Sequence, residues 1–140
     1  MGDYSKPINN IIIVGAGFMG TQIGFHCAVK GYPVCFYDAS GKALETVMPA
    51  CEEKFDFAFA AQPATADEKD NVLKRIRLGN NIERAVSDSD LVVEAVPENL
   101  ELKRDVFARL DQMCPTHTVL ATNSSSIPVS RIEGATRRLD

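Results

Sequence analysis

The sequence predicts an α/β fold in which a doubly wound, mostly parallel sheet carries a helical-arm insertion after its second strand. Short β-branched apolar runs alternate with helical patterns, and a glycine-rich turn follows the first run. The 140 residues fit one domain, and a content of 45% hydrophobic residues with a net charge of -4 indicates a folded chain. This acidic balance argues against a nucleic-acid partner.

The first expected unit is a strand, a helix and a second strand. Residues 8–14 and 34–38 are rich in β-branched and aromatic side chains, which is typical of strands buried on both faces of a parallel sheet. Between them, residues 21–30 are expected to form a helix that Gly31 ends. This alternation predicts a right-handed crossover between parallel strands.

Three helical segments are expected after the second strand. Ser40 can cap a first helix, which Pro49 should end or kink because proline lacks an amide proton. A second helix is expected over residues 52–61, and a third, opened by a Thr-x-x-Glu capping box, over residues 65–76. The second and third helices are more than a crossover requires, so we expect them to form an arm beyond the sheet.

The second half of the chain continues the alternation of strands and helices. A short strand at residues 81–82 and a helical turn at residues 83–86 precede a strongly apolar strand at residues 91–96. An asparagine can cap the next helix, over residues 99–113, which carries an apolar stripe at helical spacing. The last expected strand covers residues 118–122.

Other features of the sequence exclude several classes of protein. The four cysteines form no C-x-x-C pair and have no histidine at metal-ligand spacing, so no metal site is expected. No run reaches the roughly 20 apolar residues that a membrane helix needs. We therefore expect a cytoplasmic protein without a membrane partner.

The segment VGAGFMG follows the first expected strand and contains the pattern G-x-G-x-x-G. In this pattern the first glycine allows a tight turn, the second lets the backbone approach a pyrophosphate, and the third lets helix and strand pack closely. The amides at the start of the helix can bind the phosphates. The expected cofactor-binding residues of this turn are Gly15, Ala16, Gly17, Phe18, Met19 and Gly20.

Asp38 ends the second expected strand, eighteen residues after Gly20. A carboxylate at this position can accept hydrogen bonds from the adenosine ribose hydroxyls and repels a 2′-phosphate. The next three residues include no arginine, so the sequence favours NAD over NADP. A flavin-binding start is an alternative, although flavoproteins more often carry glutamate here. A second alternative is a glycine turn that binds no ligand, with an incidental aspartate on the surface.

Polar residues follow the two strongest strands of the second half. Glu98 and Lys103 flank a helix start after one strand, and Asn123 and Ser125 follow the other. In a doubly wound sheet the ligand lies beyond the carboxyl ends of the strands, so both tips should face the nicotinamide half of the cofactor. A capping glutamate with a solvated lysine is the alternative for the first pair. Ser126 is expected to cap a helix that a following proline opens.

Five segments of the chain carry a family resemblance: VGAGFMG, FYD, DLVVEAVPENLELKRDVF, LATNSSSIP and TRRLD. In order and spacing they resemble the NAD-binding domain of L-3-hydroxyacyl-CoA dehydrogenases. The resemblance implies a Rossmann domain over residues 1–140 in an enzyme that interconverts (S)-3-hydroxyacyl-CoA and 3-ketoacyl-CoA, as in fatty-acid β-oxidation or its reverse. It also implies NAD as cofactor, an acyl-CoA substrate, and a homodimer formed through a C-terminal helical domain.

The resemblance assigns roles to individual residues. Glu98 and Lys103 match the family's cofactor-contacting glutamate and lysine, and Asn123 matches the asparagine of its Asn-x-Ser-Ser segment. Ser125 matches the serine that lies beside both the nicotinamide and the substrate hydroxyl, so it is the expected catalytic residue. Ser124 stands where the family usually has threonine.

Two parts of the family pattern are not matched. The family places a serine and a lysine that contact CoA in the arm. The corresponding positions here are Lys54 and Ala61, so neither contact carries over cleanly. The family's general-base histidine, its glutamate partner and the helical substrate domain would lie beyond Asp140. His26 is expected in the first helix and His117 at the opposite end of the sheet, so neither can replace the base. This chain alone is therefore expected to be inactive.

Two other functions stay open on the sequence. The chain could be a non-catalytic module that binds NAD, or it could belong to a related hydroxyacid dehydrogenase with another substrate. The weak match of the arm keeps the second of these open.

Overall fold

The computed structural model of the chain describes residues 6–138; Met1 and Asp140, the ends of the expected domain, lie outside the described residues. Five parallel strands form one sheet in the order β3-β2-β1-β4-β5. The strands are β1 (Ile11–Val14), β2 (Val34–Tyr37), β3 (Ile76–Gly79), β4 (Leu91–Glu94) and β5 (Val119–Thr122). The predicted doubly wound sheet is confirmed, since the chain builds outward from β1 to one edge and then to the other.

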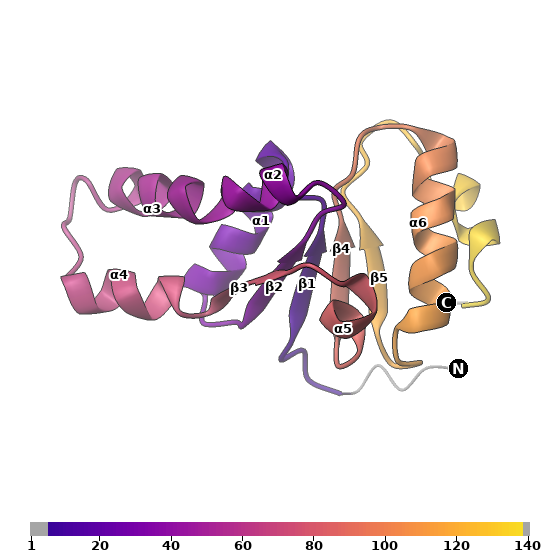
Figure 1. The fold of residues 1–140 in the computed structure, drawn as a ribbon, viewed down its shortest axis with the longest axis horizontal. Coiled ribbons are helices and arrows are strands. Elements are labelled where there is room, and N and C mark those ends of the chain that lie inside the picture. Colours follow the sequence, from indigo (N-terminus) through magenta and orange to yellow (C-terminus); the bar gives the residue numbers. More distant parts are fainter. Residues whose placement is uncertain (1–5, 139–140) are drawn as a thin grey trace.

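Helices pack against both faces of this sheet (Figure 1). They are α1 (Phe18–Val29), α2 (Gly41–Glu45), α3 (Val47–Ala58), α4 (Ala66–Leu73), α5 (Ile82–Val86) and α6 (Leu100–Met113), followed by the 3-10 turns η1 (Val129–Arg131) and η2 (Glu133–Ala135). Among residues 6–138, no helix is long and apolar enough to cross a membrane.

The core consists of two apolar clusters that β1 separates. Ile11 and Ile13 point toward α1 and α3, whereas Ile12 and Val14 point toward α5 and α6. All four side chains are at most 4% exposed. Burial on both faces explains why this strand reads as an uninterrupted apolar run.

The predicted arm is formed by α3 and α4, which project together from one side of the sheet (Figure 1). Its capping box is confirmed: the Thr65 hydroxyl accepts a hydrogen bond from Glu68 N at 3.2 Å, and the Glu68 carboxylate accepts one from Thr65 N at 2.7 Å. The predicted helix break at Pro49 is wrong, because the break lies at Thr46. Pro49 is in the first turn of α3, where amides have no partner within the helix, so its missing proton costs nothing.

The structure also corrects the prediction around β3. The third predicted helix, residues 65–76, extends too far, because α4 ends at Leu73. The prediction of a short strand at residues 81–82 is wrong. Residues 76–79 form the edge strand instead, and Asn81 caps α5 through a hydrogen bond of 2.9 Å from the helix backbone. The side chains of Arg77 and Leu78 are exposed at this edge, so the apolar pattern of a buried strand is absent.

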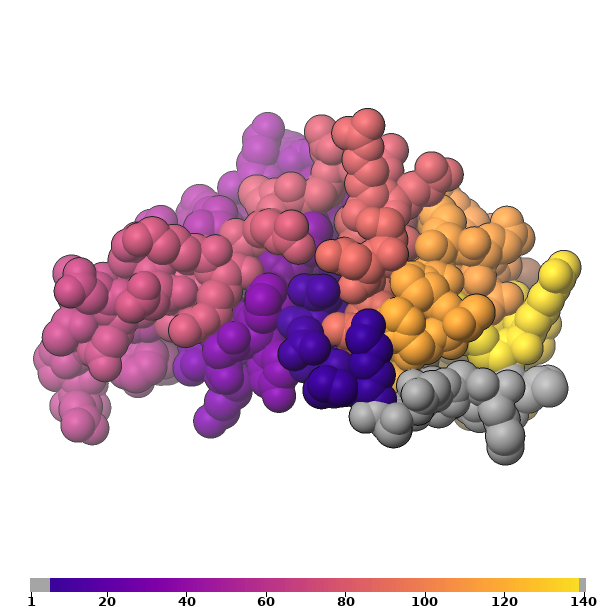
Figure 2. All heavy atoms as spheres, turned by 90° about the horizontal axis from the view of Figure 1, so that it is seen from below, coloured from indigo at the N-terminus to yellow at the C-terminus, as the bar shows by residue number. Residues whose placement is uncertain are grey.

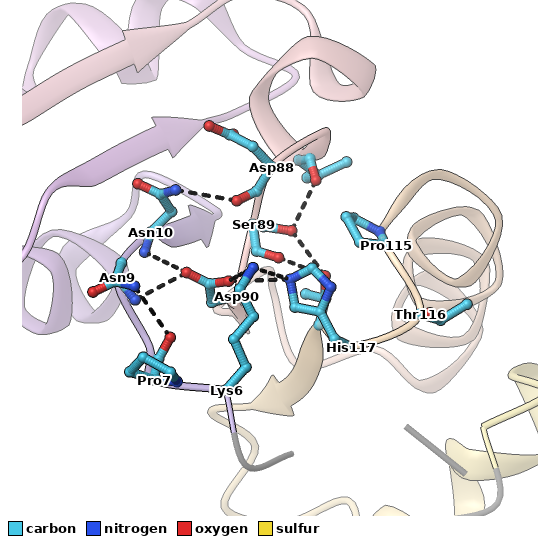
Figure 3. Close-up of polar contacts among 12 residues, drawn as sticks. Lys6, Pro7, Asn9, Asn10, Asp88, Ser89, Asp90, Pro115, Thr116 and His117 are labelled. Carbon is cyan, nitrogen blue, oxygen red and sulfur yellow. Dashed lines mark hydrogen bonds and ion pairs between the residues drawn. The ribbon is translucent and has the colours of Figure 1, made fainter. Parts of the chain in front are cut away.

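A buried carboxylate ties the start of the described chain to β4 and β5 at the amino ends of the strands (Figure 3). Asp90 Oδ2 accepts hydrogen bonds of 2.9 Å from the backbone amides of Asn9 and Asn10, and Oδ1 lies 3.0 Å from both Lys6 Nζ and His117 Nε2. Burial opposes the ionised form, but these four donors outweigh it and hold the pKa of Asp90 well below its ordinary value. Figure 2 views this end of the molecule, where the indigo N-terminal residues lie between the arm and the orange segments.

We expect Asp90→Asn to lower the free energy of unfolding at pH 7 by about 1–3 kcal/mol, because asparagine removes the charge that holds Lys6 and His117. The depressed pKa of Asp90 means that its contribution is complete above the ordinary value of 3.8 and is lost as the pH falls below it. Urea unfolding of both proteins at pH 7 and at about pH 2.5 measures this difference. A difference that stays constant on acidification would contradict the assignment.

Candidate functional site

A cavity of about 880 Å³ lies across the carboxyl ends of the strands, at the opposite end of the sheet from Asp90. Most of the predicted site residues line it: Gly15, Gly17, Phe18, Met19, Asp38, Glu98, Asn123 and Ser125. The other three, Ala16, Gly20 and Lys103, are buried behind this lining. A cavity of this size is in the range of sites for small molecules and cofactors.

The glycine turn between β1 and α1 is tightly packed at two positions and open at the third. Gly15 has a φ of 110°, and a Cβ there would lie 2.6 Å from the backbone oxygen of Ala95. A Cβ on Gly20 would lie 1.9 Å from the backbone oxygen of Gly15. A Cβ on Gly17 would meet no atom within 4 Å. A ligand can therefore approach the backbone at Gly17, where the free amides of the helix start favour a phosphate.

Asp38 follows β2 and is held beside the glycine turn by two backbone amides. Its Oδ2 accepts a hydrogen bond from Ala16 N and its Oδ1 accepts one from Ser40 N, both at 2.8 Å. Each carboxylate oxygen retains a further lone pair, so Asp38 can still accept hydrogen bonds from hydroxyl groups in the cavity. The bond to Ala16 is a second role, stabilising the turn, that the sequence does not reveal.

The cavity also has a wall, apolar except for Arg109, that sequence reasoning missed. Leu102, Val106 and Arg109 line it from α6, and Val96 and Pro97 line it from the loop after β4. The first three are spaced i, i+4, i+7 and therefore share one helix face, which was the available signal. Leu102 and Val106 belong to the apolar stripe that the sequence predicts on this helix. Such a wall suits a flat ring.

Glu98 joins the loop after β4 to residues 124–126, here called the serine loop. Its Oε1 accepts hydrogen bonds from the hydroxyls of Ser124 and Ser126, the latter at 2.8 Å, and from Ser126 N at 3.2 Å. The two hydroxyls, the Ser126 amide and the ammonium of Lys103 lower the pKa of Glu98 to about 2. Glu98 is therefore ionised at physiological pH and holds the serine loop at the cavity.

Ser126 does not have the predicted role, and Ser124 has one that was not predicted. The predicted cap at Ser126 is wrong: its hydroxyl donates to Glu98, and Pro128 flanks a single 3-10 turn, η1, that has no side-chain cap. Ser124 closes the loop, since its hydroxyl accepts a hydrogen bond of 2.9 Å from the amide three residues later. Ser125 lies between the two and lines the cavity.

Lys103 is 1% exposed, and Glu98 lies between it and the cavity. Its ammonium is 2.7 and 3.0 Å from the two carboxylate oxygens of Glu94, which is 0% exposed, and 3.3 Å from Glu98 Oε2. Sequence reasoning missed Glu94, although a glutamate that ends a wholly apolar strand was a signal. The direct cofactor contact expected of Lys103 stays a prediction.

Neither histidine lies at this cavity. His26 is on α1 beside Phe25, and His117 is at the amino ends of the strands with Asp90 (Figure 3). Within residues 6–138, no three His, Cys, Asp or Glu side chains converge to hold a metal ion. A proton acceptor of the histidine type would therefore have to reach the cavity from outside the part of the chain that the structure describes.

Comparison with known proteins gives consistent matches. The family profile described as 3-hydroxyacyl-CoA dehydrogenase, NAD binding domain, matches residues 10–140. A probable 3-hydroxyacyl-CoA dehydrogenase of Caenorhabditis elegans is 38% identical over 125 residues, covering 86% of this chain and 42% of that protein. A probable 3-hydroxybutyryl-CoA dehydrogenase of Bacillus subtilis (strain 168) is 34% identical over 131 residues, covering 94% of this chain and 45% of that protein.

A solved structure shows the same fold. The (S)-3-hydroxybutyryl-CoA dehydrogenase from Ralstonia eutropha matches with a TM-score of 0.88 and 30% identity, over 94% of this chain and 46% of that one. The chain thus spans less than half the length of these relatives. Its cavity fits an NAD molecule, since the open backbone at Gly17 suits a pyrophosphate and the free lone pairs of Asp38 suit ribose hydroxyls.

We expect Gly17→Ala and Gly20→Ala to impair the protein in different ways. The methyl group of Gly17→Ala fits the folded chain but occupies the approach to the backbone, so NADH binding should weaken at least about tenfold with stability changed by less than about 1 kcal/mol. The methyl group of Gly20→Ala collides with the turn and should cost about 1–3 kcal/mol of stability. Thermal unfolding and calorimetric titration with NADH separate the two effects. Normal NADH binding by Gly17→Ala would contradict the placement of the pyrophosphate.

Proposed function

The chain belongs to the family of 3-hydroxyacyl-CoA dehydrogenase NAD-binding domains, and from that premise we propose that it serves an enzyme that interconverts (S)-3-hydroxyacyl-CoA and 3-ketoacyl-CoA. NAD is the cofactor of the domain. The observation that carries the proposal is the order of polar groups along the carboxyl edge of the sheet. Asp38 follows β2, Gly15 and Gly17 follow β1, Glu98 follows β4, and Ser125 follows β5.

This order gives the cofactor a direction across the sheet. A carboxylate that accepts hydrogen bonds from hydroxyl groups lies at β2, and an open backbone and helix start lie at β1. The carboxylate of Glu98 lies at β4, and serine hydroxyls lie at β5. We therefore place the adenosine at β2, the pyrophosphate at β1 and the nicotinamide at the tips of β4 and β5. The apolar wall from α6 is available to the adenine ring.

Ser125 is the residue of this chain that we propose to act on the substrate. Its neighbours Ser124 and Ser126 are both bonded to Glu98, so the loop holds Ser125 at the cavity. Its hydroxyl can orient the substrate oxygen at the carbon that exchanges hydride. When bound, NAD supplies the redox chemistry by accepting or donating that hydride.

Removal of the hydroxyl proton requires a base within hydrogen-bond reach. Neither His26 nor His117 lines the cavity. We infer that the base comes from outside these residues, in the part of the enzyme that this chain does not span, together with the surface that completes the acyl-CoA site. Dimerisation through that part is a further expectation of the same proposal.

We expect Asp38→Asn to reduce the preference for NADH over NADPH. The wild-type chain should bind NADH at least about tenfold more tightly, because the carboxylate repels a 2′-phosphate; asparagine removes the charge and should narrow the ratio by about tenfold. Fluorescence titration with both cofactors gives the ratio of the NADH and NADPH affinities. A general loss of stability lowers both affinities alike and leaves this ratio unchanged. Asp70→Asn, which neutralises an exposed carboxylate of the arm, is the matched control and should leave the ratio unchanged. An unchanged ratio in Asp38→Asn would remove Asp38 from the adenosine site.

We also expect the 140-residue chain to bind NADH without oxidising it when acetoacetyl-CoA is added, because neither of its histidines lines the cavity to supply the proton that the ketone oxygen takes up. Absorbance at about 340 nm follows the reaction, and a calorimetric titration with NADH shows that the cofactor is bound. Measurable turnover by the purified chain would contradict the assignment of the base. The substrate class is tested on the enzyme that contains this domain, with 3-hydroxyacyl-CoA thioesters and the matching free hydroxyacids. Activity confined to the free acids would favour a related hydroxyacid dehydrogenase.

A further inference from the structure

Glu94 is a fully buried carboxylate at the carboxyl end of β4, and it lies behind the cavity lining. Three groups donate hydrogen bonds to it: Val96 N at 2.7 Å, Lys103 Nζ at 2.7 and 3.0 Å, and Thr122 Oγ1 at 2.7 Å. These bonds occupy both carboxylate oxygens and fix the side chain in one position. Glu94 therefore has no free oxygen for a ligand, and its role is to hold the residues that donate to it.

Two chains of hydrogen bonds lead from Glu94 to the serine loop. One passes through Thr122, whose hydroxyl accepts a hydrogen bond of 3.2 Å from Ser124 N. The other passes through Lys103, which lies 3.3 Å from Glu98, and Glu98 accepts a hydrogen bond from the Ser124 hydroxyl. The two chains close into what we call the glutamate ring: Glu94, Thr122, Ser124, Glu98 and Lys103.

Fold stability alone is a poor explanation for the ion pair in this ring. Taking a carboxylate and an ammonium out of water costs several kcal/mol per ion, and replacing such a pair by apolar side chains of similar volume is often neutral or stabilising. Glu94 and Lys103 are 0% and 1% exposed, so nearly the whole desolvation cost applies. Their directional bonds, in contrast, fix the loops after β4 and β5 relative to each other, which apolar contacts do less specifically.

We propose that Glu94 is a positioning residue for the nicotinamide half of the cofactor. It acts through Lys103 and Thr122 on the serine loop, which presents Ser125 to the cavity. The inference rests on the proposed placement of the nicotinamide at the tips of β4 and β5. Loss of Glu94 then loosens the hold on the nicotinamide and leaves the adenosine and pyrophosphate, held from β2 and β1, unaffected.

NADH and ADP-ribose, which lacks the nicotinamide ring, are the probes that test this inference on the 140-residue chain. Glu94→Gln should weaken NADH binding at least about tenfold and change ADP-ribose binding by less than about twofold. In the free protein, the amide resonance of Ser126, which donates to Glu98, should move in nitrogen–proton spectra, whereas that of Asn9 at the other end of the sheet should not.

Two further variants keep the test valid if Glu94→Gln folds poorly. Glu94→Gln combined with Lys103→Met removes both charges, so its unfolding temperature should stay within about 5 °C of the wild type. Its NADH binding should still be weakened selectively, because Glu98 has lost its ammonium partner. Asp90→Asn is the matched control, since it changes a buried carboxylate at the other end of the same strand. It should lower stability and leave the binding of both probes unchanged.

The outcomes separate the possible failures. Parallel loss of NADH and ADP-ribose affinity, or wild-type NADH affinity in the double variant, would mean that Glu94 has only a structural role. If Ser125→Ala and Glu98→Gln weaken NADH selectively but Glu94→Gln does not, the inference fails and the proposed function stands. If none of these variants affects NADH selectively, the placement of the nicotinamide fails, and the inference fails with it.

Discussion

The site depends on the parallel register that aligns the last residues of four strands. Val14, Tyr37, Glu94 and Thr122 form one row across the sheet. The backbone bonds continue one residue further, from Gly15 N to Tyr37 O at 2.9 Å and from Asn123 N to Glu94 O at 2.8 Å. Consequently the glycine turn, the acid after β2 and the serine loop all begin at the same edge. A slip of one residue in β4 would move Glu94 to the other face of the sheet, away from Lys103.

The four-residue strand β4 has a buried carboxylate at each end, and the two carboxylates have different roles. Asp90, just before the strand, accepts hydrogen bonds from two backbone amides and contacts the Lys6 ammonium and the His117 ring, which joins the entries of β1, β4 and β5. Glu94, at the end of the strand, is held by Lys103 and Thr122 and joins the exits of β4 and β5. The first contributes to stability far from the cavity. The second lies directly behind the cavity, so its geometry is transmitted to bound molecules.

The sequence predicted features that depend on local chemistry and missed those that depend on tertiary contacts. The strands β1, β2 and β4, the capping box at Thr65 and the order of elements follow from residue patterns, since buried parallel strands and caps have strong local signals. The edge strand β3 has no such signal, because two of its four residues are exposed to solvent. The sequence marks Glu94 as unusual but does not show that it is the partner of Lys103. Its expected role came from a motif, whereas its burial against Glu94 results from the packing of α6 on β4.

The two halves of the cavity are fixed by different means, which determines how each can vary. At β1 and β2, backbone contacts set the geometry: the turn has no space for a Cβ at Gly15 or Gly20, and Asp38 is held by amides. A side chain added at Gly15 or Gly20 therefore also changes the fold. At β4 and β5, side chains set the geometry through the glutamate ring, in which position 124 contributes a backbone amide and a hydroxyl. Threonine supplies the same hydroxyl as Ser124, so this half can be altered without disturbing the sheet. Position 124 can therefore vary between serine and threonine without loss of the glutamate ring.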